Sequence, residues 1–510
     1  MAPADNMDVM RQVENLSDAK RKLLEQYSLG ALGRSDKQSQ TIRRRPAGEF
    51  APLSLAQEQL WYRSQVEGIP PLYNESITIQ LGAPLDVAAL ERSLAEIIHR
   101  HEIWRTSYDR LDGALVQIIH AHPNFALPEL DLRSLPEQER EKEALRIVTE
   151  EARRPFDLRR GPLLRAVLLR TSETAYRLSL TAHLSIVDGV SVYQVLPSEL
   201  SALYTAFSAG KPSPLPELAI QYSDYAYWQR DWVKRDAWSK QLEYWREQFR
   251  GGVPALEWPA ACRSSEVPTY HGAIRQFALS KPVTDAAKEW SRSEGVTLFT
   301  TLVTTLAGVL HCYTRQPDFT IGTPSPAGRK RSEVRPLLGY FLNPVALRMD
   351  LGGKPSFREL LSRAKRVIAM AISNDDVPIE VLGQELHLQP NPSAPFFSVA
   401  VSLQPQTPDL TTGWQVTSMD ADSGGAPWDL YLAFIDRADG MIGRAQYNPD
   451  LFEPETITLL IDHVELVLEA AVADPEQAVS GLFATLPGPA EWNRKELSSL
   501  SSLSSLPMKR

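Results

Sequence analysis

Cysteine is scarce in this chain of 510 residues, which contains only Cys262 and Cys312. Two cysteines exclude a disulfide framework, and neither lies in a CxxC or similar metal-ligand spacing. We therefore expect both residues to be free thiols, and we expect the protein to be cytoplasmic because that compartment is reducing.

Long apolar runs and an excess of positive charge are also lacking. No uncharged apolar run reaches the roughly 18 residues that a membrane span requires, and the polar N-terminus has no signal-peptide pattern. The net charge of −9 argues against general nucleic-acid binding. The short basic runs at 43–45 and 328–331 are typical of a solvated surface. We expect neither a membrane nor a nucleic acid as a partner.

Patterns typical of metal sites and hydrolases are missing as well. His120 and His122 have a spacing that suits chelation from a strand, but no third ligand cluster accompanies them, so no metal is predicted. Ser191 is not part of a G-x-S-x-G nucleophile motif. His101 lies on the apolar stripe of a predicted helix, where a hydrogen-bonded core histidine is expected rather than a catalyst.

The length is sufficient for two domains or two large lobes. Residues 1–48 look separate from the body: a short amphipathic helix is predicted over 16–27, followed by a polar linker, and the whole is an N-terminal helix and linker or a docking segment. Residues 486–510 are rich in Ser and Leu, and we expect a disordered tail there.

The body between these ends mixes helical and extended patterns, which predicts an α/β (α+β) fold. Residues 86–102 carry apolar side chains at helical spacing, with Asp86 as N-cap. Residues 176–183 alternate with period two, which places His183 on the more polar face of a strand. In the second half, Thr297 is expected to cap a helix that precedes a strand at 318–323. The recurrence of helix and strand hints at two related lobes.

Five segments resemble, in the correct order, motifs of the condensation domains of nonribosomal peptide synthetases, which are relatives of chloramphenicol acetyltransferase. They are LSLAQEQLWY (53–62), RHEIWRTSY (100–108), YSDYAYWQ (222–229), LGYFLNPVALR (338–348) and NDDVPIE (374–380). The resemblance covers about residues 50–480, with Gln59 where Arg is usual. It implies two chloramphenicol-acetyltransferase-like lobes, 49–225 and 226–485, in a V-shaped pseudo-dimer with a central tunnel.

The sixth motif of the family, His-His-x-x-x-Asp-Gly, is altered in this chain. Aligned on Asp188 and Gly189, its first histidine is His183, and Leu184 stands where the second would be. In the family the second histidine faces the tunnel and assists the attacking acceptor, which leucine cannot do. Neighbouring residues of a strand point to opposite faces, so His183 should not reach the place of the missing base. Its role is therefore either catalytic or structural.

The resemblance also implies roles for the residues around this motif. His183, Asp188 and Gly189 are the catalytic candidates. Asp188 is expected to pair with Arg329 across the two lobes and so hold the loop, and Gly189 to permit a tight turn. Further structural or tunnel-lining positions are Ser191, Tyr340, Asn343 and Trp428.

Two functions follow from the resemblance. The first is a condensation enzyme that joins a carrier-tethered donor acyl thioester to a carrier-tethered acceptor amine or hydroxyl, with no bound cofactor and with substrates on the phosphopantetheine arms of donor and acceptor carrier proteins. The second is a non-catalytic module that recruits or gates carrier proteins, because Leu184 replaces the base. Residues 16–48 resemble a linker after a carrier domain, whereas the Met start and Ser/Leu end suggest a complete chain. We thus expect a monomer or part of a larger synthetase.

Overall fold

The structure of the protein is a computed structural model. It describes residues 41–66, 68–82, 84–121, 125–233, 238–259, 269–387, 396–417 and 421–482. The chain divides into two units, Met1–Arg43 and Arg44–Arg510, and the description below concerns the second. The helix predicted over 16–27, the tail at 486–510 and Cys262 lie outside the described residues.

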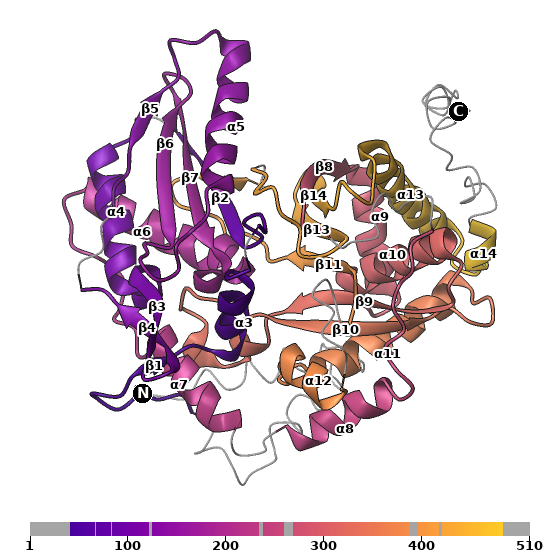
Figure 1. Ribbon diagram of the computed structural model, residues 1–510. Coiled ribbons are helices and arrows are strands. Elements are labelled where there is room, and N and C mark those ends of the chain that lie inside the picture. The colour runs from indigo at the N-terminus through magenta and orange to yellow at the C-terminus, as the bar shows by residue number, and fades with distance from the viewer. Residues whose placement is uncertain are drawn as a thin grey trace, which may run out of the picture. The chain divides into compact units, whose positions relative to one another are not determined.

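A five-stranded sheet organises the first lobe, with strand order β12-β2-β7-β6-β5 (Figure 1). Its strands are β2 (Asn74–Gly82), β5 (Glu129–Asp131), β6 (Leu164–Arg170), β7 (Ala175–His183) and β12 (Gln415–Thr417). The long antiparallel pair at its centre runs from Asn74 opposite His183 to Gly82 opposite Ala175. This pair ends at the altered motif and thereby positions it.

Helices accompany this sheet, and one of them is the helix that the sequence predicts over 86–102. Helix α4 (Val87–Arg100) begins after Asp86, whose side chain accepts the N–H of Ala89 at 2.9 Å, so the expected N-cap is confirmed. The other helices of this lobe are α3 (Leu55–Arg63), α5 (Glu137–Arg153) and α6 (Leu196–Ser208), with the short 3₁₀ turn η1 (Glu102–Arg105) after α4. A small sheet, β1 (Ala51–Pro52), β4 (Ala114–Ile119) and β3 (Thr106–Leu111), completes the lobe.

The polar face of β7 is buried rather than open to water. Arg177 is 7% exposed and forms an ion pair with Glu141 of α5 at 2.6 Å. Asn74 of β2 donates to the carbonyl oxygens of Ala152 and Arg154 at the end of the same helix. Helix α5 thus covers the face that carries His183, and it supplies hydrogen-bond or ion-pair partners to Arg177 and Asn74 on that face.

A six-stranded sheet organises the second lobe, with strand order β10-β9-β11-β13-β14-β8. Strand β11 is parallel to β9 and β13, and the other pairs are antiparallel. The strands are β8 (Ala273–Leu279), β9 (Asp318–Ser325), β10 (Asn343–Asp350), β11 (Val399–Gln404), β13 (Leu430–Arg437) and β14 (Gly440–Tyr447). The strand predicted at 318–323 is therefore confirmed as the start of β9.

Helices and the largest hydrophobic core of the described residues belong to this second sheet (Figure 1). Thr297 caps α10 (Leu298–Thr314) by accepting the N–H of Thr300 at 3.2 Å, as predicted. The remaining helices of this lobe are α8 (Ser239–Gln248), α9 (Lys281–Ser293), α11 (Phe357–Ser373), α12 (Ile379–Glu385), α13 (Pro454–Ala473) and α14 (Val479–Leu482), whereas α7 (Tyr222–Val233) packs against β1 and α3 of the first lobe. Among the described residues no single helix is long and apolar enough to cross a membrane; α9 and α10 meet those criteria only together, with a bend of 108°.

One strand crosses from the second half of the sequence to the first sheet. Strand β12 lies between β11 and β13 along the chain, yet it pairs antiparallel with β2, with Val416 opposite Ile79. Just beyond it, Asp422 accepts a hydrogen bond from Arg153 of α5 at 2.7 Å. A boundary at residue 225 therefore does not separate the two sheets completely.

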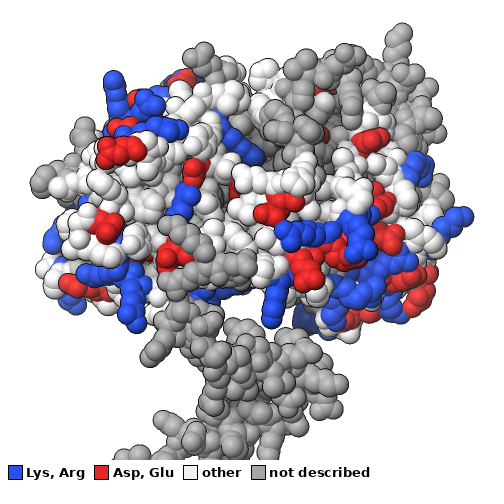
Figure 2. All heavy atoms as spheres, turned by 60° about the horizontal axis from the view of Figure 1, so that its bottom comes forward, with Lys and Arg blue, Asp and Glu red and all other residues white. Residues whose placement is uncertain are grey.

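Figure 2 shows acidic and basic side chains interspersed on the face that it draws.

Candidate active site

The altered motif lies where β7 gives way to a helix. His183 is the last residue of β7, and Leu184 opens the 3₁₀ turn η2 (Leu184–Ile186). Asp188 then caps the following helical segment, because its Oδ1 accepts the N–H of Ser191 at 2.8 Å. That segment begins at 189–190 and continues through the π-helical η3 (Ser191–Val195) into α6. The loop thus presents a helix N-terminus directly after the strand.

His183 is buried within the first lobe, with 4% of its surface exposed. Its Nδ1 accepts the N–H of Ser185 at 3.2 Å and lies 2.8 Å from the Ser185 hydroxyl. The rings of Tyr73 and Phe156 meet the imidazole edge-on. Burial lowers the pKa of His183 to about 3, so the ring is neutral near pH 7.

A cavity of about 1010 Å³ lies beside this loop, and both lobes line it. Leu184 is one of the lining residues, whereas His183 is not. Leu184 packs against a cluster that contains Leu60, Tyr73 and Tyr340, and its backbone N–H donates to the Tyr73 carbonyl at 2.7 Å. The side chain at the usual base position therefore faces the cavity, and the histidine beside it does not.

Asp188 and Arg329 form a bidentate ion pair, as the resemblance implied. Nε and Nη2 of Arg329 each lie 2.8 Å from a carboxylate oxygen of Asp188. The two side chains, Arg329 and Asp188, are 5% and 0% exposed. Arg329 also donates to the carbonyl oxygen of Leu337 at 3.0 Å, and Asp188 accepts the N–H of Phe341 at 3.2 Å. The pair ties the loop of the first lobe to the segment before β10.

Ser191 and Tyr340 belong to the same connection. The Ser191 hydroxyl lies 3.1 Å from both the N–H and the carbonyl oxygen of Gly339, and it accepts a hydrogen bond from Arg329 at 2.8 Å. The carbonyl oxygen of Tyr340 accepts the hydroxyl of Tyr222 at 2.6 Å. Burial raises the pKa of the Tyr340 phenol well above its usual range. Tyr340 lines the cavity, whereas Ser191 lies behind the wall.

Asn343 and Trp428 are both in the wall of the cavity. Asn343 Nδ2 donates to the carbonyl oxygens of Asp375 and Val377, both at 2.7 Å, so this side chain holds the 374–380 segment against β10. The Trp428 ring packs against Tyr431 edge-on at a centroid distance of 5.3 Å. The first residue fixes the shape of the wall, and the second supplies apolar surface to it.

Gly189 does not adopt the conformation that a tight turn requiring glycine would have. Its φ lies outside the left-handed region, so the expectation that it permits such a turn is wrong. A Cβ added here would lie 2.6 Å from Oε1 of Gln404 at the end of β11. Glycine is instead suited to this position because a side chain of the second lobe approaches the backbone closely.

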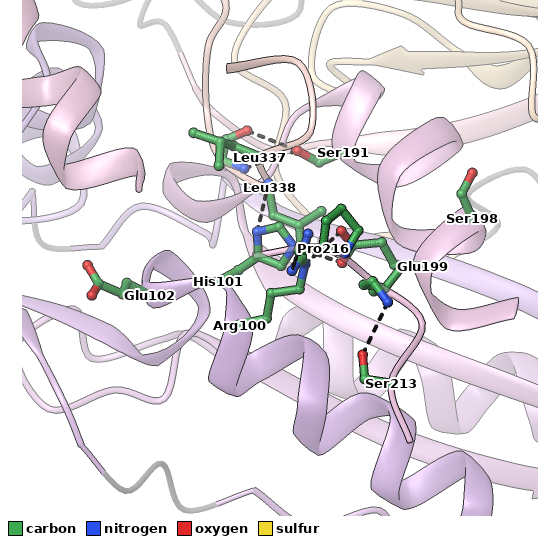
Figure 3. Close-up of polar contacts among 12 residues, drawn as sticks. Arg100, His101, Glu102, Ser191, Ser198, Glu199, Ser213, Pro216, Leu337 and Leu338 are labelled. Carbon is green, nitrogen blue, oxygen red and sulfur yellow. Dashed lines mark hydrogen bonds and ion pairs between the residues drawn. The ribbon is translucent and has the colours of Figure 1, made fainter. Parts of the chain in front are cut away.

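His101 is a hydrogen-bonded core residue, as the sequence predicts. It lies directly after α4 and is 1% exposed. Its Nε2 donates to Glu199 of α6 at 2.8 Å, and its Nδ1 accepts the N–H of Leu338 at 3.2 Å. Figure 3 shows Arg100, His101 and Glu199 pointing toward one another, with Leu338 at the far side of the imidazole. This contact joins α4 and α6 to the same segment that Arg329 holds.

Some charged residues of the cavity wall were not singled out by the sequence, among them Glu75 and Arg444. Glu75 of β2 and Arg444 of β14 line the cavity from opposite lobes. Side chains alternate between the two faces of β2, so Glu75 lies on the face opposite Asn74. This alternation is the sequence feature that could have indicated Glu75. Nothing in the spacing connects it to Arg444.

No group of three or more His, Cys, Asp and Glu side chains is placed to hold a metal within the described residues. His120 Nε2 lies 2.8 Å from the Ser107 hydroxyl, and His122 lies outside the described residues. Cys312 is a buried free thiol, and burial raises its pKa to about 12.

The two sheets, the shared cavity and the Asp188 loop define a two-lobed protein of the chloramphenicol-acetyltransferase-like class. The family described as "Condensation domain" matches residues 47–490, and the chain belongs to this family of nonribosomal peptide biosynthesis. The resemblance and the fold inferred from the motifs are therefore confirmed.

Relatives agree with this assignment. A linear gramicidin synthase protein of Brevibacillus parabrevis is 36% identical over 96% of this chain, which spans 10% of that relative's length. The X-domain in its complex with OxyB from teicoplanin biosynthesis has a TM-score of 0.72 at 25% identity, covering 87% of this chain and 97% of that one. The first condensation domain of the calcium-dependent antibiotic synthetase has a TM-score of 0.75 at 19% identity, covering 85% and 98%, which shows the fold.

Proposed function

We propose that this condensation domain joins a donor acyl thioester to an acceptor amine or hydroxyl, with both groups tethered to carrier proteins by phosphopantetheine arms. The observation that carries the proposal is the cavity of about 1010 Å³, which both lobes line and which lies against the Asp188 loop. The reaction needs two substrates to meet away from water, and a cavity between two lobes is suited to that.

The bond changes balance without a cofactor. The acceptor nitrogen or oxygen attacks the thioester carbonyl, a C–N or C–O bond forms, and the C–S bond breaks. The proton lost by the acceptor ends on the sulfur of the departing donor arm. A neutral amine is itself nucleophilic, so a base increases the rate of this reaction but is not part of its stoichiometry.

Backbone N–H groups at the start of the helical segment are suited to stabilise the oxyanion of the tetrahedral intermediate. Gly189 and Val190 line the cavity and occupy the first turn after the cap Asp188. The first N–H groups of a helix have no acceptor within the helix, and the helix dipole favours negative charge there. Arg329 keeps Asp188, and with it this turn, in place.

In this proposal Leu184 contributes shape instead of proton transfer, and His183 is a structural residue. Nδ1 of the buried imidazole already pairs with the N–H and the hydroxyl of Ser185, and the ring does not line the cavity. Positioning two tethered reactants is worth roughly 7 kcal/mol or more, which provides acceleration without a base. We thus expect a slow enzyme or one whose acceptor needs little base assistance.

Reconstitution tests the proposal. The full chain is mixed with an acyl-loaded donor carrier and an aminoacyl-loaded acceptor carrier, and the acceptor carrier is analysed by mass spectrometry. The proposal predicts that the acceptor gains the donor acyl group faster than in a mixture without the chain. Equal rates with and without the chain, over a panel of loaded carriers, would refute it.

A second candidate function is the recruitment or gating of carrier proteins without catalysis. Leu184 at the base position favours it, and so does the similarity to the X-domain, whose complex with OxyB has a protein partner on that fold. Binding of loaded carriers with no product in the same reconstitution is the outcome that supports this function.

A further inference from the structure

A carboxylate lies on the strand beside Leu184. Strands β2 and β7 are neighbours (Figure 1), and Glu75 of β2 is opposite Ala182 of β7. The N–H of Leu184 donates to the carbonyl oxygen of Tyr73 at 2.7 Å, so the two segments stay paired as far as Leu184. Glu75 and Leu184 are thus diagonal neighbours, and both line the cavity. A long side chain reaches across such a diagonal, which brings the Glu75 carboxylate to the surroundings of position 184.

The Glu75 carboxylate has unused capacity to accept a hydrogen bond. Within the part of the chain that the structure describes, it accepts none, and its ion-pair partner Arg444 of β14 lies 3.9 Å away, which is too far for a hydrogen bond. By contrast, both oxygens of Asp188 accept hydrogen bonds from Arg329. A carboxylate of the cavity wall that is not already bound can accept a proton from a substrate.

The groups around Glu75 suit a base. Burial raises the pKa of Glu75, and the charge of Arg444 offsets part of that rise. The other titratable groups that face it are the phenols of Tyr193 in η3 and Tyr431 in β13, which are neutral because burial raises their pKa values as well. A carboxyl group with a raised pKa accepts a proton more readily near neutral pH than an ordinary one does.

We propose that Glu75 accepts the proton of the attacking amine or hydroxyl, in place of the histidine that Leu184 replaces. The assignment rests on the proposed function, since it gives a residue to the same reaction. As the C–N or C–O bond forms, the proton of the attacking group passes to a carboxylate oxygen of Glu75. As the C–S bond breaks, that proton passes to the sulfur of the departing arm, and the carboxylate is restored.

Glu75→Gln tests the assignment, because it removes the base at nearly the same volume. Single-turnover rates are measured with the full chain and the loaded carrier pair that gives the most product in the reconstitution. The variant should react about 10-fold or more slowly than the parent, since general bases typically contribute about 10²–10⁴-fold and a carboxylate is a weaker base than an imidazole. The control is Glu143→Gln, whose glutamate pairs with Arg146 on the surface of α5 and which should react at the parent's rate. Equal rates for Glu75→Gln and the parent would overturn the assignment.

The pH dependence separates proton transfer from a packing defect. A protonated Glu75 cannot accept a proton, and neither can glutamine, so the ratio of the parent rate to the Glu75→Gln rate should fall toward one as the pH is lowered from about 8 to about 5. The acceptor amine titrates in both proteins and cancels from the ratio. A ratio that is above one and constant across this range contradicts the assignment.

Leu184→His distinguishes a base from any other role of Glu75. An imidazole at position 184 takes over the proton, so Glu75→Gln should then slow the reaction by only about twofold or less. If Glu75→Gln costs the same factor with leucine and with histidine at position 184, Glu75 is not the base.

The remaining outcomes keep the two proposals apart. A parent chain that forms no product overturns the proposed function and the assignment together, whereas product formed equally fast by the parent and by Glu75→Gln overturns the assignment alone. Glu380 of α12 also lines the cavity, and a slower Glu380→Gln beside an unchanged Glu75→Gln would move the base there. If Glu75→Gln does not fold, Glu75→Gln with Arg444→Met takes its place in each comparison, because the loss of both charges is tolerated better than the loss of one.

Discussion

Replacing Arg329 with alanine should lower the free energy of unfolding by about 4 kcal/mol. The change removes the guanidinium that holds Asp188 through two contacts of 2.8 Å. The Asp188 side chain is 0% exposed, so water does not replace the lost partner. A buried carboxylate without its counter-charge typically costs about 3–5 kcal/mol.

The remaining contacts place this loss in the middle of that range. Asp188 keeps the N–H groups of Ser191 and Phe341, at 2.8 and 3.2 Å, which limit the cost of the unpaired charge. In the other direction, the carbonyl oxygen of Leu337 and the hydroxyl of Ser191 lose the donors that Arg329 supplied. These two effects are each of the order of one hydrogen bond, about 1 kcal/mol, and have opposite signs.

Urea denaturation followed by tryptophan fluorescence measures the change, from the shift in midpoint at an unaltered slope. The control is Arg146→Ala, since that arginine pairs with Glu143 and Glu150 on the surface of α5 and should change the midpoint little. In Asp188→Asn with Arg329→Met, both charges are absent, so most of the lost stability should return. A midpoint for Arg329→Ala equal to that of the parent would refute the reasoning.

Three further changes test the loop. Leu184→His should raise the condensation rate by about 10²–10⁴-fold without lowering the melting temperature, because position 184 faces the cavity; lost stability with no gain in rate would contradict this. Stability should fall as the pH drops from 6.5 toward 3, at up to about 1.4 kcal/mol per pH unit, because burial lowers the pKa of His183 to about 3 and the unfolded chain binds the extra proton. In urea titrations across this range, His183→Gln should remove that contribution. If the free energy of unfolding of the variant falls with pH as steeply as that of the parent, His183 is not its source. Gly189→Ala should lower the melting temperature only slightly, because Oε1 of Gln404 is the end of a flexible side chain and can move away from the new methyl group; a large loss that Gln404→Ala relieves would show that this side chain cannot move.

Local features of the fold follow from the sequence because their causes are local. Asp86 and Thr297 cap their helices through contacts to residues three positions on, and the apolar spacing after each cap already indicates the helix. The alternation over 176–183 likewise predicts a strand, and β7 occupies these residues in the structure. What the alternation does not reveal is that α5 covers its polar face, since that depends on a neighbour from elsewhere in the chain.

The resemblance to the family predicted the ion pair that holds the candidate site together. The role expected for one residue, Gly189, was wrong. The pairing of Asp188 with Arg329, which are 141 positions apart, came from the family motifs and is present in the structure. The role expected for Gly189 was wrong because a glycine in a loop does not by itself distinguish an unusual φ from a close neighbour. The neighbour, Gln404, lies in the other lobe.

By itself, the sequence determined the family, the order of the motifs, the capped helices and the absence of a histidine at position 184. The tertiary structure decided which side chains share the cavity, that β12 joins the first sheet, and that Glu75 meets Arg444. The physical reason is that caps and periodicity act over a few residues, whereas these contacts arise where two sheets from distant parts of the chain meet. The sequence gives the identity of each residue, but only the packing of the two sheets determines which of them contact each other.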